Sequence, residues 1–294
     1  SGDAVVRLLS PETGAEEMRV EGGNVWDMSF SQDGRYLATT TPYDNVTRVT
    51  DLSTGSTVWE ESYGGNSVEF STDGLSLLLV ENNLRIYRAL TGELLQTFRY
   101  SDYLDYGAYV PGSAMIVSSV GSQPKILIWD IEMGQVVRTL SPSTGSVTRA
   151  FAFSSDGRYL ATGGDGGTIV LWDTSSWEEI GRFVGHGATV ERALDYSHDG
   201  RYLASGSADR TVRVWDIATG EQIRHFSGYT DAIVSVGFTS NDNRLLIVTA
   251  DGIVRLSYVH LQDAIDDLCQ RMIGDLDEAA QGRFGIVATG PTCP

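Results

Sequence analysis

The sequence predicts an all-β protein built from a repeated unit of four short antiparallel strands. Three segments are near copies of one another: FSQDGRYLATT at Phe30–Thr40, FSSDGRYLATG at Phe153–Gly163 and YSHDGRYLASG at Tyr196–Gly206. Weaker copies lie at Phe70–Val80, Tyr109–Ser119 and Phe238–Val248. Their turn residues follow one another at intervals of 38 to 45 residues and are Gly34, Gly74, Gly112, Gly157, Gly200 and Asn243. A repeat of this period indicates supersecondary units that pack against one another.

Each unit contains the same four predicted strands. An apolar strand enters the Asp-Gly turn, which favours a tight hairpin, and a second strand such as RYLASG follows it. The third strand alternates, as at Thr211–Asp216, so that Val212 and Val214 share one sheet face. A polar turn then leads to a fourth strand, Gln222–Phe226. A single sheet cannot bury both of its faces, so the units must pack face to face, and a radial arrangement of them is a β-propeller.

The strands do not divide evenly into blades. Six first and six second strands are predicted, but seven third strands, because AVVRLLS (Ala4–Ser10) precedes the first full unit. Glu16–Val20 is then a fourth strand without a blade of its own, and the last unit has no fourth strand. We expect the N-terminal strand to complete the last blade, which would pair its open edge and close six blades. Seven blades would need two further inner strands from a longer parent protein.

The repeat resembles the WD-repeat family over about residues 4–258. Trp-Asp ends the third strand in three units, at Trp129-Asp130, Trp172-Asp173 and Trp215-Asp216. Three units depart from this pattern, at Arg48–Leu52, Arg85–Ala89 and Val254–Tyr258. The resemblance implies a WD40-type β-propeller of four-stranded antiparallel blades.

The last 35 residues differ from the repeat, so we divide the chain into a propeller at 1–259 and a C-terminal helix and extended tail at 260–294. Leu261, Ile265, Leu268 and Met272 recur at helical spacing, and Gly274 follows at a C-cap position. We expect this helix to pack on the propeller, and docking onto a partner is the other interpretation. Cys269 and Cys293 are the only cysteines; a disulfide between them is open, although a reducing cytosol would oppose it.

The tail also loosely resembles a C-terminal extension of bacterial multidomain proteins. The matching features are a helix with a cysteine and an arginine, and a closing Thr-Cys-Pro. In such proteins a propeller follows a signal-transduction NTPase, a protein kinase or a protease. The resemblance therefore implies a cytoplasmic signalling or defence protein in which an upstream effector domain of the same polypeptide is a partner.

The charge balance excludes two classes of partner. The chain has 39 acidic and 21 basic residues, a net charge of −18, which repels nucleic-acid phosphate and anionic lipid. A basic peptide or protein is permitted, and solubility alone is the other explanation of the charge. No apolar run approaches the roughly 18 residues of a membrane-spanning helix, and the first residues do not resemble a signal peptide.

One unit holds the residue types of a nucleophilic triad, in His186, Ser205 and Asp209. A nucleophile elbow of the form G-x-S-x-G is absent. In the WD-repeat family these three positions, together with the position of Trp215, form a structural hydrogen-bond tetrad, so the resemblance implies a structural role. We find no H-E-x-x-H, no P-loop and no cysteine pair at zinc spacing, and we expect no catalytic residue, metal or cofactor.

The loops that precede first strands, and those that join second to third strands, gather on one face of a propeller. Three of them carry tyrosines and acids: Thr40–Val46, Tyr100–Tyr106 and Ser227–Ile233. The candidate partner-binding residues are Tyr43, Asp44, Asp102, Tyr103, Asp105, Tyr229 and Asp231. Ordinary polar loops with half-buried tyrosines are the other explanation.

The sequence thus favours a non-enzymatic protein-interaction or sensor scaffold with a protein or peptide partner. The alternative is a propeller hydrolase or lyase with its site at the channel mouth. An autoinhibitory cap without an external ligand is a third reading.

Overall fold

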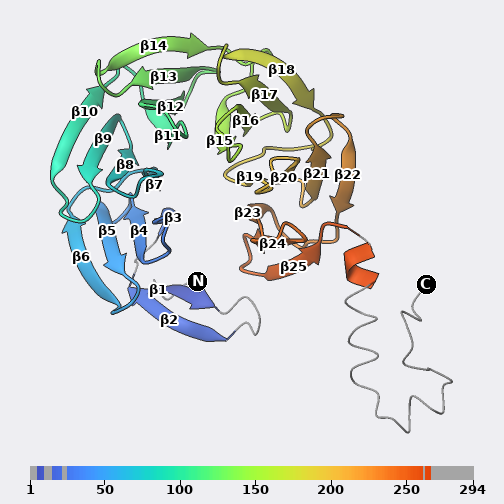
Figure 1. Ribbon diagram of the computed structural model, residues 1–294, viewed down its shortest axis with the longest axis horizontal. Helices are drawn as coiled ribbons and strands as arrows, with labels where there is room; N and C mark the ends of the chain where they lie inside the picture. The colour runs from blue at the N-terminus through green and yellow to red at the C-terminus, as the bar shows by residue number, and fades with distance from the viewer. Residues whose placement is uncertain (1–4, 10–14, 22–24, 261, 266–294) are drawn as a thin grey trace, which may run out of the picture.

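Six β-sheets lie around a central channel, and each corresponds to one unit of the sequence repeat (Figure 1). The computed structural model describes residues 5–9, 15–21, 25–260 and 262–265. We number the sheets blades 1 to 6 in chain order. Neighbouring strands within a blade are antiparallel, and the first strand of each blade lies nearest the channel.

The strand bounds follow the repeat closely. Blade 1 consists of β3 (Asp27–Phe30), β4 (Tyr36–Thr41), β5 (Val46–Asp51) and β6 (Ser56–Glu61). Blade 2 consists of β7 (Ser67–Phe70), β8 (Ser76–Val80), β9 (Asn83–Arg88) and β10 (Leu94–Arg99). Blade 3 consists of β11 (Leu104–Tyr109), β12 (Met115–Val120), β13 (Ile126–Asp130) and β14 (Gln135–Leu140).

Blade 4 consists of β15 (Thr148–Phe153), β16 (Tyr159–Gly164), β17 (Ile169–Asp173) and β18 (Glu178–Phe183). Blade 5 consists of β19 (Leu194–Tyr196), β20 (Tyr202–Gly206), β21 (Val212–Asp216) and β22 (Gln222–Phe226). Blade 6 has three strands, β23 (Ile233–Phe238), β24 (Arg244–Thr249) and β25 (Val254–Tyr258). Two more strands, β1 (Val5–Leu9) and β2 (Glu16–Glu21), form a separate sheet that we call the N-terminal hairpin.

The Ser-x-Asp-Gly segments of the repeat form the hairpin between first and second strands. In blade 5 the Ser197 hydroxyl donates to Asp199 Oδ1 (2.6 Å) and accepts the N–H of Tyr202 (2.8 Å). Asp199 Oδ1 also accepts the N–H of Arg201 (2.9 Å), and Gly200 has a φ of 71° that L-residues rarely adopt. The same bonds recur around Ser31, Ser71 and Ser154, which explains why these residues repeat.

The hydrophobic core lies between successive blades. Ile126 and Ile128 of β13 are fully buried and cluster with Leu160 and Trp172 of blade 4. The third strand of one blade thus packs on the second and third strands of the next, as the alternating pattern predicts. The all-β, six-blade propeller expected from the sequence is confirmed.

The expected closure of the ring is wrong. The N-terminal strand β1 pairs with β2 and not with β25, and in the described part of the chain β25 has no fourth-strand partner. Val6 and Val20 face each other across the hairpin and pack on Leu37 of β4. Contact with blade 1, together with local pairing in the hairpin, therefore replaces the predicted pairing with blade 6. Figure 1 shows the ring open between the N-terminal hairpin and blade 6.

The chain beyond β25 begins against blade 5. Val259 is fully buried and its carbonyl accepts a hydrogen bond from Arg224 Nε of β22 (2.7 Å). The His260 ring meets that of Tyr202 edge-on, with centroids 5.4 Å apart. Residues 262–265 are helical, whereas the rest of the expected helix, together with Cys269 and Cys293, lies outside the described residues. No helix of the described residues has the length and apolar character needed to cross a membrane.

Candidate interaction face and the channel

The structure brings His186, Ser205, Asp209 and Trp215 into one hydrogen-bond network within blade 5. Trp215 Nε1–H donates to Ser205 Oγ (2.9 Å), and this oxygen lies 2.8 Å from His186 Nε2. His186 Nδ1 lies 3.0 Å from Asp209 Oδ2. Since the ionised carboxylate of Asp209 can only accept, the proton of the neutral imidazole sits on Nδ1, and Ser205, whose oxygen accepts from the indole, donates its hydroxyl proton to Nε2. One continuous chain of donors therefore runs from Trp215 to Asp209.

The ionisation states of the two titratable members fit this chain. Burial lowers the pKa of His186, against the opposing effect of Asp209, so the imidazole is neutral near pH 7. Burial raises the pKa of Asp209, but hydrogen bonds from Thr211, the Gly187 N–H and His186 outweigh it and lower the pKa to about 2. The network therefore joins a neutral imidazole to a carboxylate that four donors satisfy.

Ser205 cannot act as the nucleophile of a triad in this setting. Its side chain is 0% exposed, between the indole of Trp215 and the imidazole of His186. Two other blades repeat the indole–hydroxyl part of the network without a histidine, because Trp129 donates to Ser118 (2.8 Å) and Trp172 to Thr162 (3.0 Å). A buried indole N–H needs an acceptor, and these hydroxyls supply it.

The candidate binding residues near blade 1 are exposed on the loop face. By this face we mean the end of the ring that carries the loops before first strands and between second and third strands. Tyr43 is 75% exposed, and its ring meets that of Trp26 edge-on with centroids 5.8 Å apart. Asp44 beside it is also exposed. Trp26, which the sequence did not single out, is thus part of an exposed aromatic pair.

The candidates near blade 3 are partly engaged within the fold. The Tyr103 ring is exposed, whereas its hydroxyl accepts a hydrogen bond from Asn66. Asp102 accepts the N–H of Tyr103 (2.8 Å) and a bond from Gln123. Asp105 lies 3.5 Å from the Arg149 guanidinium, and burial raises the pKa of its carboxyl against the attraction of Arg149. These contacts fix the loop in one conformation while leaving aromatic surface available.

The role expected for Tyr229 is corrected by the structure. Its side chain is only 8% exposed and packs with Ile233, Val236 and Val259 in the core between blades 5 and 6. The Arg255 guanidinium lies 5.1 Å from the ring and covers it further. A buried ring cannot anchor an external partner, because it already contributes to the core. Asp231 in the same loop is exposed and accepts the N–H of Ala232 (2.8 Å).

Arg192 bridges the channel at the loop face, a role that no sequence pattern indicated. It precedes β19 in blade 5, yet its Nη2 donates to the Asn66 carbonyl (2.9 Å) and its Nε to the Tyr106 hydroxyl (3.1 Å). Nη1 donates to the Trp26 carbonyl. One side chain therefore contacts blades 1, 2 and 3 from the opposite side of the ring. The backbone of Arg192 has a φ of 57°, a sparsely populated conformation for this residue type.

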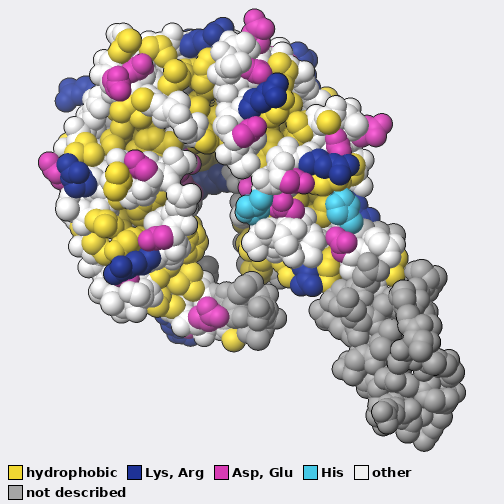
Figure 2. Space-filling view, viewed as in Figure 1, with side chains coloured by type: hydrophobic (Ala, Val, Ile, Leu, Met, Phe, Trp, Pro, Cys, Tyr) yellow, Lys and Arg dark blue, Asp and Glu magenta, His cyan; other side chains and the backbone are white. Residues whose placement is uncertain are grey.

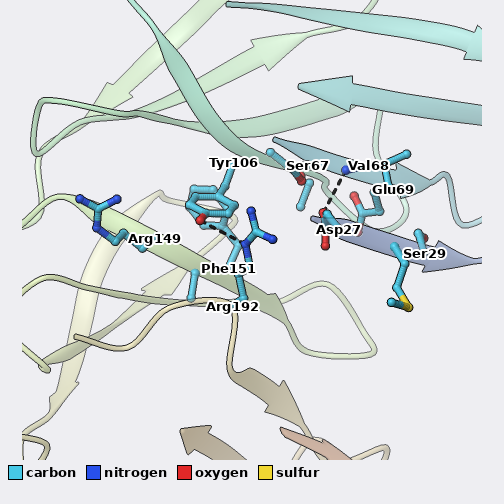
Figure 3. Close-up of a pocket in the computed structure, with 13 residues that line it drawn as sticks. Asp27, Ser29, Ser67, Val68, Glu69, Tyr106, Arg149, Phe151 and Arg192 are labelled. Carbon is cyan, nitrogen blue, oxygen red and sulfur yellow. Dashed lines mark hydrogen bonds between the residues drawn. The ribbon is translucent and has the colours of Figure 1, made fainter. Parts of the chain in front are cut away.

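Tyr106 completes this bridge. Its hydroxyl donates to Glu191 Oε1 (2.8 Å) while accepting from Arg192, and the Arg192 guanidinium lies 4.8 Å from its ring. Figure 3 shows Tyr106 and Arg192 side by side, whereas the Arg149 side chain points away from them. We call Arg192, Tyr106 and Glu191 the channel clasp.

Acidic side chains on the inner strands join neighbouring blades. Asp27 Oδ2 accepts the N–H of Val68 (3.0 Å), and Glu69 Oε2 accepts that of Tyr109 (2.6 Å). Asp195 Oδ2 accepts the N–H of Phe238 (2.7 Å). The separations between partners are 41, 40 and 43 residues, so each acid caps a backbone N–H on the open edge of the next inner strand. A single sequence repeat did not reveal this, because only some blades have an acid there.

Burial raises the pKa values of these acids. Burial raises the pKa of Glu69 to about 8. The hydrogen bond from the Tyr109 N–H lowers this pKa, and the negative charge of Asp27 raises it further. The pKa of Asp195 rises to about 6, and that of Asp27 rises against the attraction of Arg192. Asp27 and Glu69 line a cavity of ≈240 Å³ together with Tyr106, Arg149 and Arg192. Among the described residues no cluster of side chains is suited to hold a metal ion.

Comparison with known proteins agrees with this architecture. The WD40 family, described as "WD domain, G-beta repeat", matches residues 17–51, 134–173, 177–216 and 220–256, which together make up just over half of the chain. The chain is also 28% identical over 162 residues to an uncharacterized WD repeat-containing protein of Synechocystis sp.. The alignment covers 53% of this chain and 46% of that relative, so the chain spans about half of the relative's length.

Each matched family segment begins in or just before a fourth strand and runs to the third strand of the next blade, or nearly so. Blades 2 and 3 carry most of the unmatched sequence of the ring, and blade 2 has Tyr87 where blades 3, 4 and 5 have the tryptophan. Its fold is nevertheless the same four-stranded sheet. The chain belongs to the WD-repeat family of β-propellers.

Proposed function

We propose that this propeller is a non-enzymatic scaffold that binds a basic peptide or protein segment on its loop face. The observation that carries the proposal is the exposed aromatic pair of Trp26 and Tyr43 beside Asp44, with the exposed Tyr103 ring near blade 3. Exposed Trp and Tyr rings supply interface area at low entropic cost. The net charge of −18 favours a basic partner and would speed its association.

The rigid background supports this use of the loops. Arg192 of the channel clasp joins the loops before β3 and β7 to its own loop before β19, and the blade 5 network fixes the loop that begins at His186. A partner would therefore meet a surface that needs little ordering on binding. We assign His186, Ser205, Asp209 and Trp215 a structural role in this scaffold and no part in catalysis.

The experiment that tests the proposal is an array of lysine- and arginine-containing 12-residue peptides, with the purified protein as the probe. We expect salt-sensitive binding of a subset of peptides, and loss of that binding in Tyr43→Ala combined with Tyr103→Ala. The control is Met133→Ala, an exposed apolar residue in the turn between third and fourth strands, on the opposite face. Equal binding by the double variant and the control would contradict the proposal.

The alternative of a hydrolase or lyase at the channel mouth has one observation in its favour. Glu69, with a pKa of about 8, lines the cavity beside Asp27, and perturbed acids in cavities are candidates for general acid–base catalysis. Each of these acids, however, already caps a backbone N–H of the next blade. A structural role therefore accounts for the burial, and we favour the scaffold.

For the protein's context, we propose a bacterial, cytoplasmic signalling or defence protein in which an effector domain precedes the propeller. The cyanobacterial source of the WD repeat-containing relative supports the bacterial part of this proposal. We also propose the division into a propeller at 1–259 and a C-terminal unit at 260–294 that packs on it, which the contact of His260 with Tyr202 supports. Analysis of the parent gene would test both.

A further inference from the structure

The N-terminal hairpin has the position and register of the outer half of a blade. Val6 of β1 pairs with Val20 of β2, as Val212 of β21 pairs with Phe226 of β22 in blade 5. The sequences agree in the same register, since SGDAVVRLL aligns with SADRTVRVW at Ser207–Trp215 without a gap. β1 and β2 are therefore a third and a fourth strand. In the described part of the chain no second strand pairs with the inner edge of β1.

The ring is open between blade 1 and blade 6 on the inner side of β1 (Figure 1), and we call this opening the gap. The face of blade 1 that borders the gap is apolar and uncovered. Met28 and Phe30 on β3 are 46% and 48% exposed. The corresponding residues of blade 2, Val68 and Phe70, are only 3% and 6% exposed, because the preceding blade covers them. Asp27 and Ser29 on the other side of β3 bond to the N–H groups of blade 2, so Met28 and Phe30 point into the gap.

The face of blade 6 across the gap shows the same exposure. Val254 and Leu256 on β25 are 48% and 39% exposed, whereas Val212 and Val214, their equivalents in blade 5, are fully buried. Leu246 on β24 is likewise exposed. At the channel end of the gap a cavity of ≈710 Å³ lies between Trp26 and Met28 on one side and Ile233, Val234 and Val248 on the other, and Glu191 and Arg192 of the channel clasp also line it. Figure 2 shows the ring hollowed at its centre, with hydrophobic surface beside the opening.

We propose that a β-hairpin occupies this gap. It forms the two inner strands of a seventh blade and continues directly into β1. Such a hairpin would pair with the inner edge of β1 and cover Met28 and Phe30 on one side and Val254 and Leu256 on the other. Only an inner half-blade fits, since the outer half is already present as β1 and β2. The alignment of Ser1-Gly2-Asp3 with the loop Ser207-Ala208-Asp209 gives the spacing at which the hairpin would join.

The test adds a hairpin copied from the sequence repeat to the N-terminus of the chain. A copy of Ala193–Gly206, the inner hairpin of blade 5, is joined directly before Ser1, so that the natural spacing between second and third strands is kept. We expect the fused chain to bind less of the dye anilinonaphthalene sulfonate, to protect the β1 amides from hydrogen exchange, and to melt at least roughly 5 °C higher. The control is the same fusion with L194D and L203D in the copy, which cannot bury its strands.

Two results would overturn the proposal. One is a fusion that changes neither dye binding nor β1 protection relative to the control. The other is a dimer of the unfused chain, detected by light scattering, that Leu256→Asp dissociates, because a second copy would then cover the gap. A monomeric unfused chain together with protection of β1 in the fusion alone supports the hairpin.

Discussion

Replacement of His186 by alanine tests whether the Ser–His–Asp constellation holds the fold. The substitution removes one of the two donors to Asp209 Oδ2 and the acceptor of the Ser205 hydroxyl, and it opens a cavity beside Trp215. Loss of two buried hydrogen bonds at about 1–1.5 kcal/mol each, with one hydroxyl left unsatisfied, gives about 3 kcal/mol of destabilisation. At about 2–4 °C per kcal/mol for a ring of this size, the Tm falls by roughly 6–12 °C.

The assay is thermal unfolding followed by circular dichroism and calorimetry, and the chain provides a matched control. His198 also contacts an aspartate, with its Nδ1 2.8 Å from Asp242 Oδ1, but its side chain is mostly exposed. His198→Ala should therefore lower stability by less than about 1 kcal/mol. Equal Tm values for the two variants would refute a structural role for His186. Loss of a measurable turnover with an unchanged Tm would point to catalysis instead.

Three further predictions concern pH and the channel. The pKa of Glu69 in the folded protein, about 8, exceeds the value of 4.5 for a free glutamate, so ionisation of Glu69 destabilises the fold as the pH rises from 4.5 to 8. Glu69→Gln should therefore be about 2 kcal/mol more stable than wild type at pH 9, after allowance for solvent in the cavity, and no more stable at pH 4.5. Denaturant titration at both pH values measures this difference. The pKa of His186 is lowered by burial, so the free energy of unfolding should fall as pH drops below 6.5, and His186→Ala should remove that part of the acid sensitivity. Arg192→Met should cost about 2–3 kcal/mol in chemical unfolding because it removes the donors to Asn66 and Tyr106, whereas Arg210→Met, an exposed arginine with a similar φ, should cost almost nothing.

The repeat made the blades predictable because the Ser-x-Asp-Gly turn and the alternating third strand are local signals. Ser197, Asp199 and Gly200 satisfy the turn by bonds within six residues, so their meaning is visible in any one copy. The residues of the blade 5 network could be anticipated for the same reason, since all four lie within a single unit.

Contacts between distant units could not be predicted in this way. Arg192 meets the Trp26 carbonyl 166 residues away, and no periodicity relates the two. Tyr229 resembled an exposed loop tyrosine, yet it belongs to the buried cluster between blades 5 and 6, and Arg255 of the last strand lies over its ring. Closure of the ring failed as a prediction because pairing rules alone do not decide between β25 and β2 as the neighbour of β1. Packing of Val6 and Val20 on Leu37 decided it.

The most direct test of the account separates the scaffold from the surface in one set of measurements. A basic peptide selected on the array is titrated by calorimetry into wild type, His186→Ala and the double variant Tyr43→Ala, Tyr103→Ala, and the Tm of each protein is measured. The account predicts that the tyrosine variant loses at least roughly tenfold in affinity with its Tm within about 2 °C of wild type. It predicts that His186→Ala, below its melting range, keeps its affinity while its Tm falls. The opposite pattern, lost affinity in His186→Ala and none lost in the tyrosine variant, would contradict it.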